Sequence, residues 1–361
     1  MAKKVFLIKG YIDKDVLTAA KERIHYIFDL FDTVCVGFSG GKDSLAVLHL
    51  VKEVVEERGG GKVNVVFYDE ELVPDRVINF VDSYRRMPWV NMIWLAVPLA
   101  STKFILGRTF DYIQWDPKRD WVRPKPEWAY SLPAGDERVL DQYSLDDLLL
   151  SILNRPGRVA FLNGMRAAES PNRLRASLAK QHDTFINQTS PRSAACKPIY
   201  DWEENDVFRF FFERQIKYCQ IYDYQIMAGL KLRVSTPLHA EAAKLIGKQR
   251  VVDPDFYNRI LRVFPEMAVQ DRYYSELNTD HLMEKYGKSF AGIREYIMER
   301  YGGEGGQLEL ALKRLDAIEK SKGYFPTDYV LGYFIGGAIK RMLVPKAVLT
   351  RDCLANSNSP V

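Results

Sequence analysis

The residues best suited to chemistry are 39–44, Ser-Gly-Gly-Lys-Asp-Ser, which follow the apolar run TVCVGF and precede a segment with helical periodicity. The two glycines allow unusual backbone dihedrals and close approach of a ligand. The first turn of the following helix offers unpaired N–H groups and the positive end of the helix dipole. The hydroxyls of Ser39 and Ser44 can donate to phosphate oxygens, and Lys42 adds a positive charge. This string therefore predicts a phosphate-binding loop.

The same loop has a simpler interpretation. It matches neither GxxxxGK[ST] nor GxGxxG, the two common phosphate-binding patterns. An ordinary turn between strand and helix, with Asp43 or Ser44 as the N-cap, would also use glycine and serine. A lone Ser-Gly-Gly would favour that alternative. The complete six-residue string is more specific, so the phosphate-binding interpretation is preferred.

The elements that would position this loop alternate along the chain. Apolar periodicity predicts helices at 13–31, 43–58 and 73–86, and strands at 33–38, 62–70 and 91–99. Strands that alternate with helices through short connections indicate an α/β fold, a parallel sheet flanked by helices. The loop of residues 39–44 then lies at the carboxyl end of the first strand.

The alternation of strands and helices is interrupted over residues 101–157. Within them, the prolines of the Pro- and Trp-rich stretch 115–135 exclude a regular helix or a central strand. We expect an ordered insertion or lid there, whose aromatic side chains stack on a base, line a pocket or form a satellite core. A strand returns at 158–164, followed by helices at 168–180 and 201–215. These patterns predict an α/β domain over 1–221 and a mainly helical extension over 222–361.

Composition excludes several classes of protein. The 361 residues are 47% hydrophobic and 27% charged, which is typical of a soluble globular protein, and no segment reaches the ~18 apolar residues of a membrane span. A cytoplasmic location without a membrane partner is expected. The four cysteines form no CxxC pair, so neither zinc nor an iron–sulfur cluster is expected. Residues 155–200 contain eight Arg or Lys against two carboxylates, which favours an anionic partner.

SGGKDS resembles the PP-loop of the adenine nucleotide α-hydrolase (HUP) superfamily, which includes ATP pyrophosphatases and phosphoadenosine phosphosulfate (PAPS) reductases. Three further stretches are similar to the reductase-like branch: FYDEELVP at 67–74, GMRAAESPNR at 164–173 and KPIYDWEENDVFRF at 197–210. The resemblance implies a Rossmann-like sheet that binds an adenine nucleotide, ATP or PAPS, at the carboxyl ends of its strands.

The resemblance also implies roles for individual residues. Lys42 and Asp43 would be catalytic, and Asp43 and Asp69 would bind Mg²⁺; as exposed turn carboxylates, Asp69 and Glu70 could equally do neither. Arginine suits phosphate because its planar guanidinium bonds two oxygens at once, although a surface salt-bridge cluster is the alternative for the arginines here. The expected nucleotide-binding residues are Ser39, Gly40, Gly41, Lys42, Asp43, Ser44, Asp69, Glu70, Arg166, Glu169, Arg173 and Lys197.

The pattern of the reductases is incomplete. The thioredoxin-dependent enzymes attack sulfur with a cysteine in an ECGxH-like motif, whereas this sequence has RDCLAN around Cys353. The intact loop instead favours cleavage of ATP between the α- and β-phosphates, with adenylation of an acceptor. Substitution of Cys353 by serine distinguishes the two, because only a reductase needs the thiol.

Residues 218–243 are similar to a reductase-like group that includes the immunoglobulin-binding regulator A type, found in bacteria and prophages beside ParB-like partner proteins; related proteins act in DNA sulfur modification. A nucleotide-sensing or DNA-associated regulator without turnover is therefore a further hypothesis. Basic and aromatic residues could follow a nucleic-acid backbone, although a solvated helical face is the alternative. They are Arg233, Lys244, Lys248, Arg250, Arg259 and Arg262, with Phe256 and Tyr257.

Overall fold

The structure is a computed structural model that describes residues 12–106, 108–169, 173, 184–230, 232–273, 284–287, 289–303 and 305–320. The chain divides into two units. The larger unit consists of residues 13–103 and 110–271 and contains the main sheet; the remaining residues form the smaller unit.

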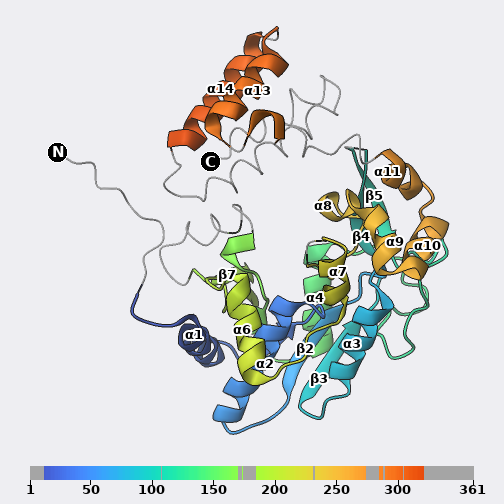
Figure 1. Ribbon diagram of the computed structural model, residues 1–361. Helices are drawn as coiled ribbons and strands as arrows, with labels where there is room; N and C mark the ends of the chain where they lie inside the picture. Colours follow the sequence, from blue (N-terminus) through green and yellow to red (C-terminus); the bar gives the residue numbers. More distant parts are fainter. Residues whose placement is uncertain are drawn as a thin grey trace. The chain divides into compact units, whose positions relative to one another are not determined.

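A six-stranded sheet forms the centre of the larger unit (Figure 1). Its strand order is β3-β2-β1-β6-β8-β7; all neighbours are parallel except β7, which runs antiparallel to β8. The predicted α/β fold with a mainly parallel sheet is confirmed. The strands are β1 (Thr33–Gly37), β2 (Val63–Tyr68), β3 (Val90–Leu95), β6 (Val159–Leu162), β7 (Ile186–Ser190) and β8 (Ser193–Cys196).

Both faces of this sheet are covered, which explains the continuous apolar runs in its strands. In β1, Val34 and Val36 belong to a core cluster formed with three helices, whereas Cys35 packs in a separate cluster with α4. The helices of the first cluster are α1 (Val16–Leu30), α2 (Lys42–Glu57) and α3 (Asp75–Arg85), joined by α6 (Glu204–Arg214). The helix on the other cluster is α4 (Gln142–Leu153).

The predicted insertion has more regular structure than its composition indicated. Residues 115–135 contain neither helix nor strand beyond one isolated bridge residue, as their prolines predict. On either side of them, however, β4 (Leu99–Ile105) and β5 (Arg108–Gln114) form a two-stranded sheet, and α4 begins at a capping box between Asp141 and Ser144. The helix predicted at 168–180 lies mostly outside the described residues; η1 (Ala167–Glu169) is a short 3-10 turn at its start.

The described elements from residue 221 onward are all helical. In chain order they are α7 (Ile221–Met227), α8 (Ala240–Ala243), η2 (Ile246–Lys248), α9 (Gln249–Val252), α10 (Pro254–Val263) and α11 (Met267–Tyr273). The smaller unit contains α13 (Phe290–Tyr301) and α14 (Gly305–Lys320), which pack through Ile293, Ile297 and Leu315. The predicted boundary at 221/222 stays a prediction. No helix in the described part of the chain has the length and apolar character that crossing a membrane requires.

Candidate functional site

The candidate site begins at the carboxyl edge of the central strand. β1 pairs with β2 on one side and with β6 on the other, where Val36 lies opposite Leu162. The chain builds β1, β2 and β3 outward in one direction and then returns to the other side of β1, so the strand order reverses between β1 and β6. Open parallel sheets bind ligands outside the carboxyl ends of their strands at such a switch point. The predicted loop 39–44 leaves β1 at this place, and residues 163–166 leave β6 there.

The backbone of the loop is held close to α3 and α2. Gly40 has φ of 75°, a left-handed conformation, and a Cβ there would lie 2.9 Å from methyl groups of Val77 and Val81. Gly41 is the N-cap of α2, so the N-cap residue itself has no side chain that could cap the helix. The N-cap is therefore Gly41, and not Asp43 or Ser44 as in the simpler interpretation, while phosphate binding by this loop stays a prediction. The helix N-terminus instead keeps the electropositive character that attracts anions.

The two serines hold the loop together. The Ser44 hydroxyl donates to the Gly41 carbonyl at 3.0 Å and lies 3.1 Å from the Ser39 hydroxyl. The Ser39 amide donates to Ser44 Oγ at 3.2 Å. These bonds pin both ends of the turn, so the serines fix the loop's shape and place their hydroxyls inside it.

Two cations flank Asp43 in the first turn of α2. Lys42 Nζ donates to Asp43 Oδ2 at 2.9 Å, and Arg166 Nε donates to Asp43 Oδ1 at 2.6 Å. Lys42 and Arg166 are each only 4% exposed, although they are 124 positions apart in the sequence. A weaker ion pair of 3.7 Å joins Lys42 to Glu204. One carboxylate thus orients two buried cations beside the helix N-terminus, and positive charge predominates among these three groups.

The segment after β6 places Arg166 against the loop. A Cβ at Gly164 would lie 2.5 Å from the backbone carbon of Asp43 and 2.6 Å from the Ser44 nitrogen, so this contact between two backbones requires glycine. Glu169 accepts a hydrogen bond from the Arg166 amide at 2.9 Å and forms an ion pair with Arg173. The structure therefore brings Arg166, Glu169 and Arg173 together with Lys42 and Asp43, as a linked set of charges.

Tyr222 on α7, although distant in sequence, contacts the loop 39–44 directly. Its hydroxyl accepts a hydrogen bond of 2.8 Å from the Lys42 amide, and its side chain is 2% exposed. Burial raises the pKa of Tyr222, so the hydroxyl stays protonated and retains a proton to donate. Tyr222 could not be identified from the sequence, because nothing in the string YCQIYDY shows which tyrosine reaches a loop 180 positions earlier.

Asp69, at the end of β2, is engaged in a different network. Its side chain is fully buried, and its carboxylate accepts hydrogen bonds from Trp94 Nε1 at 2.8 Å and the Glu71 amide at 3.0 Å. It also forms an ion pair with Arg123. Trp115 Nε1 donates to the Asp69 carbonyl at 2.6 Å. Both carboxylate oxygens are thus occupied by protein donors.

Glu71 binds the same insertion through a second set of bonds. Its fully buried carboxylate accepts 2.7 Å and 2.6 Å bonds from the two terminal nitrogens of Arg119, and bonds from the amides of Trp115 and Val122. Glu71 has a left-handed backbone with φ of 63°. The acidic turn after β2 therefore anchors residues 115–123. Of its two glutamates, Glu70 is predicted from the sequence as a site residue and Glu71 is not.

Glu70 lies between these two anchors but has another partner. The Thr236 amide donates to Glu70 Oε2 at 3.0 Å. Burial raises the pKa of Glu70, an effect that the Thr236 hydrogen bond and nearby His239 partly oppose. Glu70 therefore connects the β2 turn to the segment before α8.

Lys197 follows β8 at the same edge of the sheet. Leu162 and Cys196 are partners in the β6–β8 ladder, and the Asn163 amide donates to the Cys196 carbonyl at 2.9 Å. Lys197 is 7% exposed, and its own amide donates to the Phe185 carbonyl at 2.7 Å. It is thus beside the segment that carries Arg166, with one strand between it and the loop of β1.

The cysteines within the described residues are buried. Burial raises the pKa of Cys35 to about 12 and also raises the pKa of Cys219. Cys196 is likewise buried in the core. A thiolate, the reactive form, is therefore disfavoured at Cys35 and Cys219. Cys353 lies outside the described residues.

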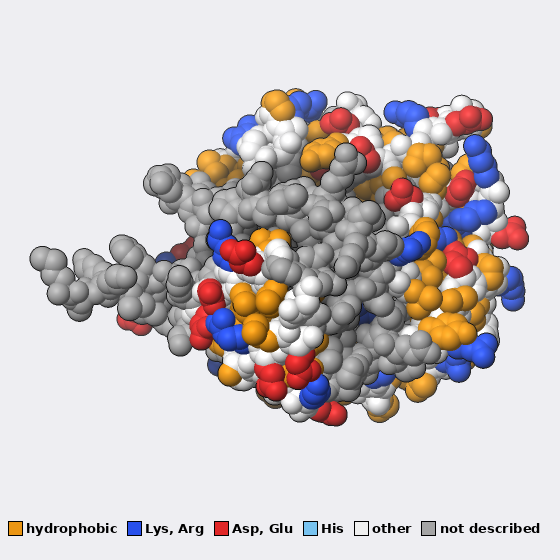
Figure 2. Space-filling model, turned by 90° about the horizontal axis from the view of Figure 1, so that it is seen from above, with side chains coloured by type: hydrophobic (Ala, Val, Ile, Leu, Met, Phe, Trp, Pro, Cys, Tyr) orange, Lys and Arg blue, Asp and Glu red, His pale blue; other side chains and the backbone are white. Residues whose placement is uncertain are grey.

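Two of the basic residues singled out between positions 233 and 262 are held in ion pairs. Arg250 forms an ion pair with Asp271, and Arg259 with Asp75 at 2.9 Å. Phe256 and Tyr257 are buried, so their rings are not available to stack on bases. In the view of Figure 2, Lys and Arg side chains are interspersed with Asp and Glu side chains and hydrophobic groups.

Comparisons with known proteins place these features in a family. The profile of the "Phosphoadenosine phosphosulfate reductase domain" matches residues 33–106 and 139–266, more than half of the chain. It omits 107–138, which include the Pro- and Trp-rich stretch. The "Uncharacterized protein YbdN" of Escherichia coli K12 is 29% identical over 260 residues, covering 67% of this chain and 63% of YbdN. The chain thus spans less than two thirds of that relative's length.

Two solved structures show a more distant likeness. An FMN adenylyltransferase of Candida glabrata, in complex with FMN and an ATP analogue, has 13% identity and a TM-score of 0.40, covering 60% of this chain and 65% of that chain. A PAPS reductase of Candida auris has 14% identity and a TM-score of 0.33, covering 59% and 94%. Likeness at these levels carries no argument about function. On the profile match, the chain belongs to the phosphoadenosine phosphosulfate reductase domain family.

Proposed function

We propose that this protein binds ATP at the carboxyl edge of β1 and cleaves it between the α- and β-phosphates, transferring the adenylyl group to an acceptor. The observation that carries the proposal is the convergence of two buried cations, Lys42 and Arg166, on the N-terminus of α2, where the N-cap residue Gly41 has no side chain. Buried cations and helix N-termini stabilise phosphate strongly, because little water competes with them.

The proposed step is a substitution at phosphorus. An oxygen of the acceptor that is already anionic, and so needs no general base, forms a bond to the α-phosphorus; the bond from that phosphorus to the α–β bridging oxygen breaks, and pyrophosphate leaves with the electron pair. Negative charge then grows on the leaving oxygens. Lys42 and the terminal nitrogens of Arg166 would stabilise this charge, and Asp43 would hold both cations in position.

The role proposed for Mg²⁺ through Asp43 and Asp69 is not supported by their surroundings. Asp43 gives one oxygen to Lys42 and the other to Arg166, and Asp69 is fully enclosed by protein donors. Among the residues that the structure describes, no group of three or more His, Cys, Asp or Glu side chains could hold a metal ion. No step of the proposed reaction therefore uses a metal held by Asp43 or Asp69.

Reduction of a phosphoadenylyl sulfate compound is the alternative reaction. The description of the matched family contains this activity, but reduction of such a compound by the thioredoxin-dependent route requires a reactive thiol. The three cysteines of the described region are buried, and burial raises the pKa of two of them. A reductase would therefore depend on Cys353. Serine in place of Cys353 should abolish a reductase and leave an adenylating enzyme active.

The acceptor side of the site would be the insertion that Asp69 and Glu71 anchor beside β1. Its outer tryptophans, Trp121 and Trp128, are 37% and 51% exposed and offer aromatic surface. In keeping with the resemblance to the immunoglobulin-binding regulator A branch, the proposed acceptor is a nucleic acid or a ParB-like partner protein. Nucleic-acid binding would weaken steeply with added salt; affinity independent of salt would contradict that acceptor.

The decisive experiment combines calorimetric titration of ATP and of PAPS, each with Mg²⁺, with an assay for pyrophosphate release. The test variant is the double substitution Ser39→Ala, Asp43→Ala, and the control is Ser151→Ala, Asp147→Ala on α4, which removes the same groups away from the site. ATP binding that the test variant alone loses would support the proposal. Selective binding of PAPS, or equal ATP binding by both variants, would overturn it.

A further inference from the structure

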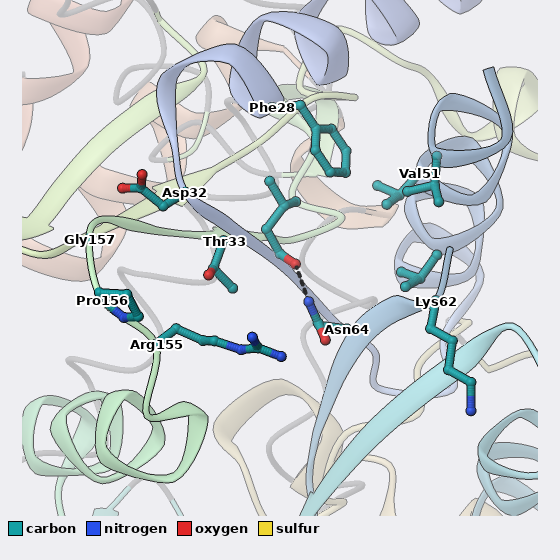
Figure 3. Close-up of a pocket in the computed structure, with 12 residues that line it drawn as sticks. Phe28, Asp32, Thr33, Val51, Lys62, Asn64, Arg155, Pro156 and Gly157 are labelled. Carbon is teal, nitrogen blue, oxygen red and sulfur yellow. Dashed lines mark hydrogen bonds between the residues drawn. The ribbon is translucent and has the colours of Figure 1, made fainter. Parts of the chain in front are cut away.

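A cavity of about 410 Å³ lies at the opposite edge of the sheet, where β1 and β2 begin (Figure 3). This edge lacks the loop and the helix N-terminus that make the carboxyl edge suited to phosphates. The volume is within the range of small-molecule sites. Its lining residues come from α1, α2, both strands and the turn before β6. They are Phe28, Asp32, Thr33, Val34, Val51, Val55, Lys62, Val63, Asn64, Arg155, Pro156 and Gly157.

The lining has an apolar wall. Phe28 from α1 and Val51 and Val55 from α2 contribute hydrocarbon surface on the helical side, as Figure 3 shows for Phe28 and Val51. Removing apolar ligand surface from water against such a wall is favourable by ~25 cal/mol per Å². This side of the cavity therefore suits an alkyl or aryl group.

The remaining lining is polar and carries an excess of positive charge. Lys62 and Arg155 line the cavity, and within the described residues neither side chain has a hydrogen-bond or ion-pair partner. The one carboxylate, Asp32, accepts a hydrogen bond of 2.7 Å from the Arg158 amide, which satisfies part of its charge locally. Asn64 is also engaged, since it donates to the Val34 carbonyl at 3.3 Å and accepts from Asn91 at 2.9 Å. The two cations are thus the groups left to pair with a ligand.

We propose that this cavity is a second ligand site, and that it binds a small amphipathic carboxylate. The hydrocarbon part lies against Phe28, Val51 and Val55, and the carboxylate pairs with Arg155, while Lys62 adds positive charge to the lining. A guanidinium can bond both oxygens of a carboxylate, which gives Arg155 the larger part in recognition. The proposal is independent of the function proposed for the loop 39–44.

The test uses octanoate as probe, titrated into the full chain by calorimetry, with 1-octanol and inorganic phosphate as partial probes. Octanoate should bind at least about tenfold more tightly than either, because only octanoate has both the chain and the charge. Equal binding of octanoate and octanol would overturn recognition of the carboxylate. Absence of octanoate binding would overturn the site.

Variants then locate the binding. The double substitution Lys62→Gln, Arg155→Gln should weaken octanoate binding about tenfold or more. The control Lys217→Gln, Arg262→Gln removes the same charges from exposed positions elsewhere and should leave the affinity unchanged. Val55→Trp fills the cavity from a partly exposed helix position and should abolish binding while the thermal unfolding midpoint is kept. Unchanged binding by Val55→Trp would show that octanoate binds at another place.

Discussion

The turns after β1 and β2 lie side by side at one edge of the sheet, and both contain residues that could bind a nucleotide. In the β1 turn the helix begins at Gly41, which has no side chain, and Lys42 and Arg166 lie around a single carboxylate. In the β2 turn, Asp69 and Glu71 are fully buried and engaged by arginine, tryptophan and backbone donors. Charged residues at a strand end can therefore be open to a ligand or committed to the fold, and their partners decide which.

The largest expected effect is on stability, and it comes from the β2 turn. Asp69→Ala should lower the free energy of unfolding by about 3–5 kcal/mol, because it leaves the Arg123 charge buried without its partner. Urea denaturation followed by tryptophan fluorescence measures this. Asp136→Ala is the control, since among the residues that the structure describes Asp136 pairs only with Arg138, in an exposed loop, and this variant should unfold as the wild type does. Equal stability of the two variants would show that the β2 turn is not a structural anchor.

On the ligand side, Arg166→Ala should reduce kcat/KM for ATP-dependent pyrophosphate release by about 100- to 1000-fold, the usual cost of removing one group that stabilises developing charge. Arg166→Lys should restore only part of the activity, since lysine cannot bond two oxygens in the same plane. Steady-state kinetics with a coupled pyrophosphate assay provide the measurement. Wild-type activity in Arg166→Ala would remove the β1 turn from the catalytic machinery.

A smaller effect is expected from the hydrogen bond by which Tyr222 supports the β1 turn. Tyr222→Phe leaves the Lys42 amide without its acceptor, which should cost about 1–3 kcal/mol of unfolding free energy and weaken ATP binding. Tyr224→Phe, two positions along the same helix and 40% exposed, is the matched control. If both variants behaved alike in chemical denaturation, the hydroxyl of Tyr222 would not support the loop.

The smallest effect concerns pH. Because burial raises the pKa of Glu70 above its ordinary value of 4.5, the folded protein holds this proton more tightly than the unfolded chain. The contribution of Glu70 to the free energy of unfolding should therefore be fully present below pH 4.5. It should be lost as the pH rises through the pKa of Glu70 in the folded state. Glu70→Gln keeps an acceptor for the Thr236 amide and should remove that fall.

Denaturant unfolding of Glu70→Gln and wild type at matched pH values tests this sign. The variant should gain relative stability at pH 8 and none at pH 4. A gain that is equal at both values would show that the effect is not the titration of Glu70.

The sequence predicted the elements with strong periodicity and missed those without it. The strands β1, β2, β3 and β6 were evident from apolar runs. β8 was not, because Ser-Ala-Ala-Cys has weak strand propensity and is recognisable only by its pairing with β6. The helix α4 was hidden inside the predicted insertion, although the capping residues Asp141 and Ser144 mark its start.

The residues of the candidate site likewise fall into those that the sequence identified and those that it did not. Resemblance to a family identified Lys42, Asp43 and Arg166, and the structure brings them into contact. Tyr222 and Glu71 could not be identified, because their importance depends on partners distant in sequence. For Asp69 the residue type was consistent with a metal ligand, and only the positions of Trp94 and Arg123 reveal its structural engagement.

The contact of Gly164 with the backbone of residues 43 and 44 determines when, during synthesis and folding, the loop 39–44 can take up its final structure. A nascent chain that has emerged only as far as residue 158 already contains the whole SGGKDS string, yet it lacks both the peptide that packs on this turn and the guanidinium of Arg166. Pairing of β6 with β1 joins residues 126 positions apart, the kind of distant contact that forms slowly. Truncated or partly folded forms of this protein should therefore carry the motif without being able to use it.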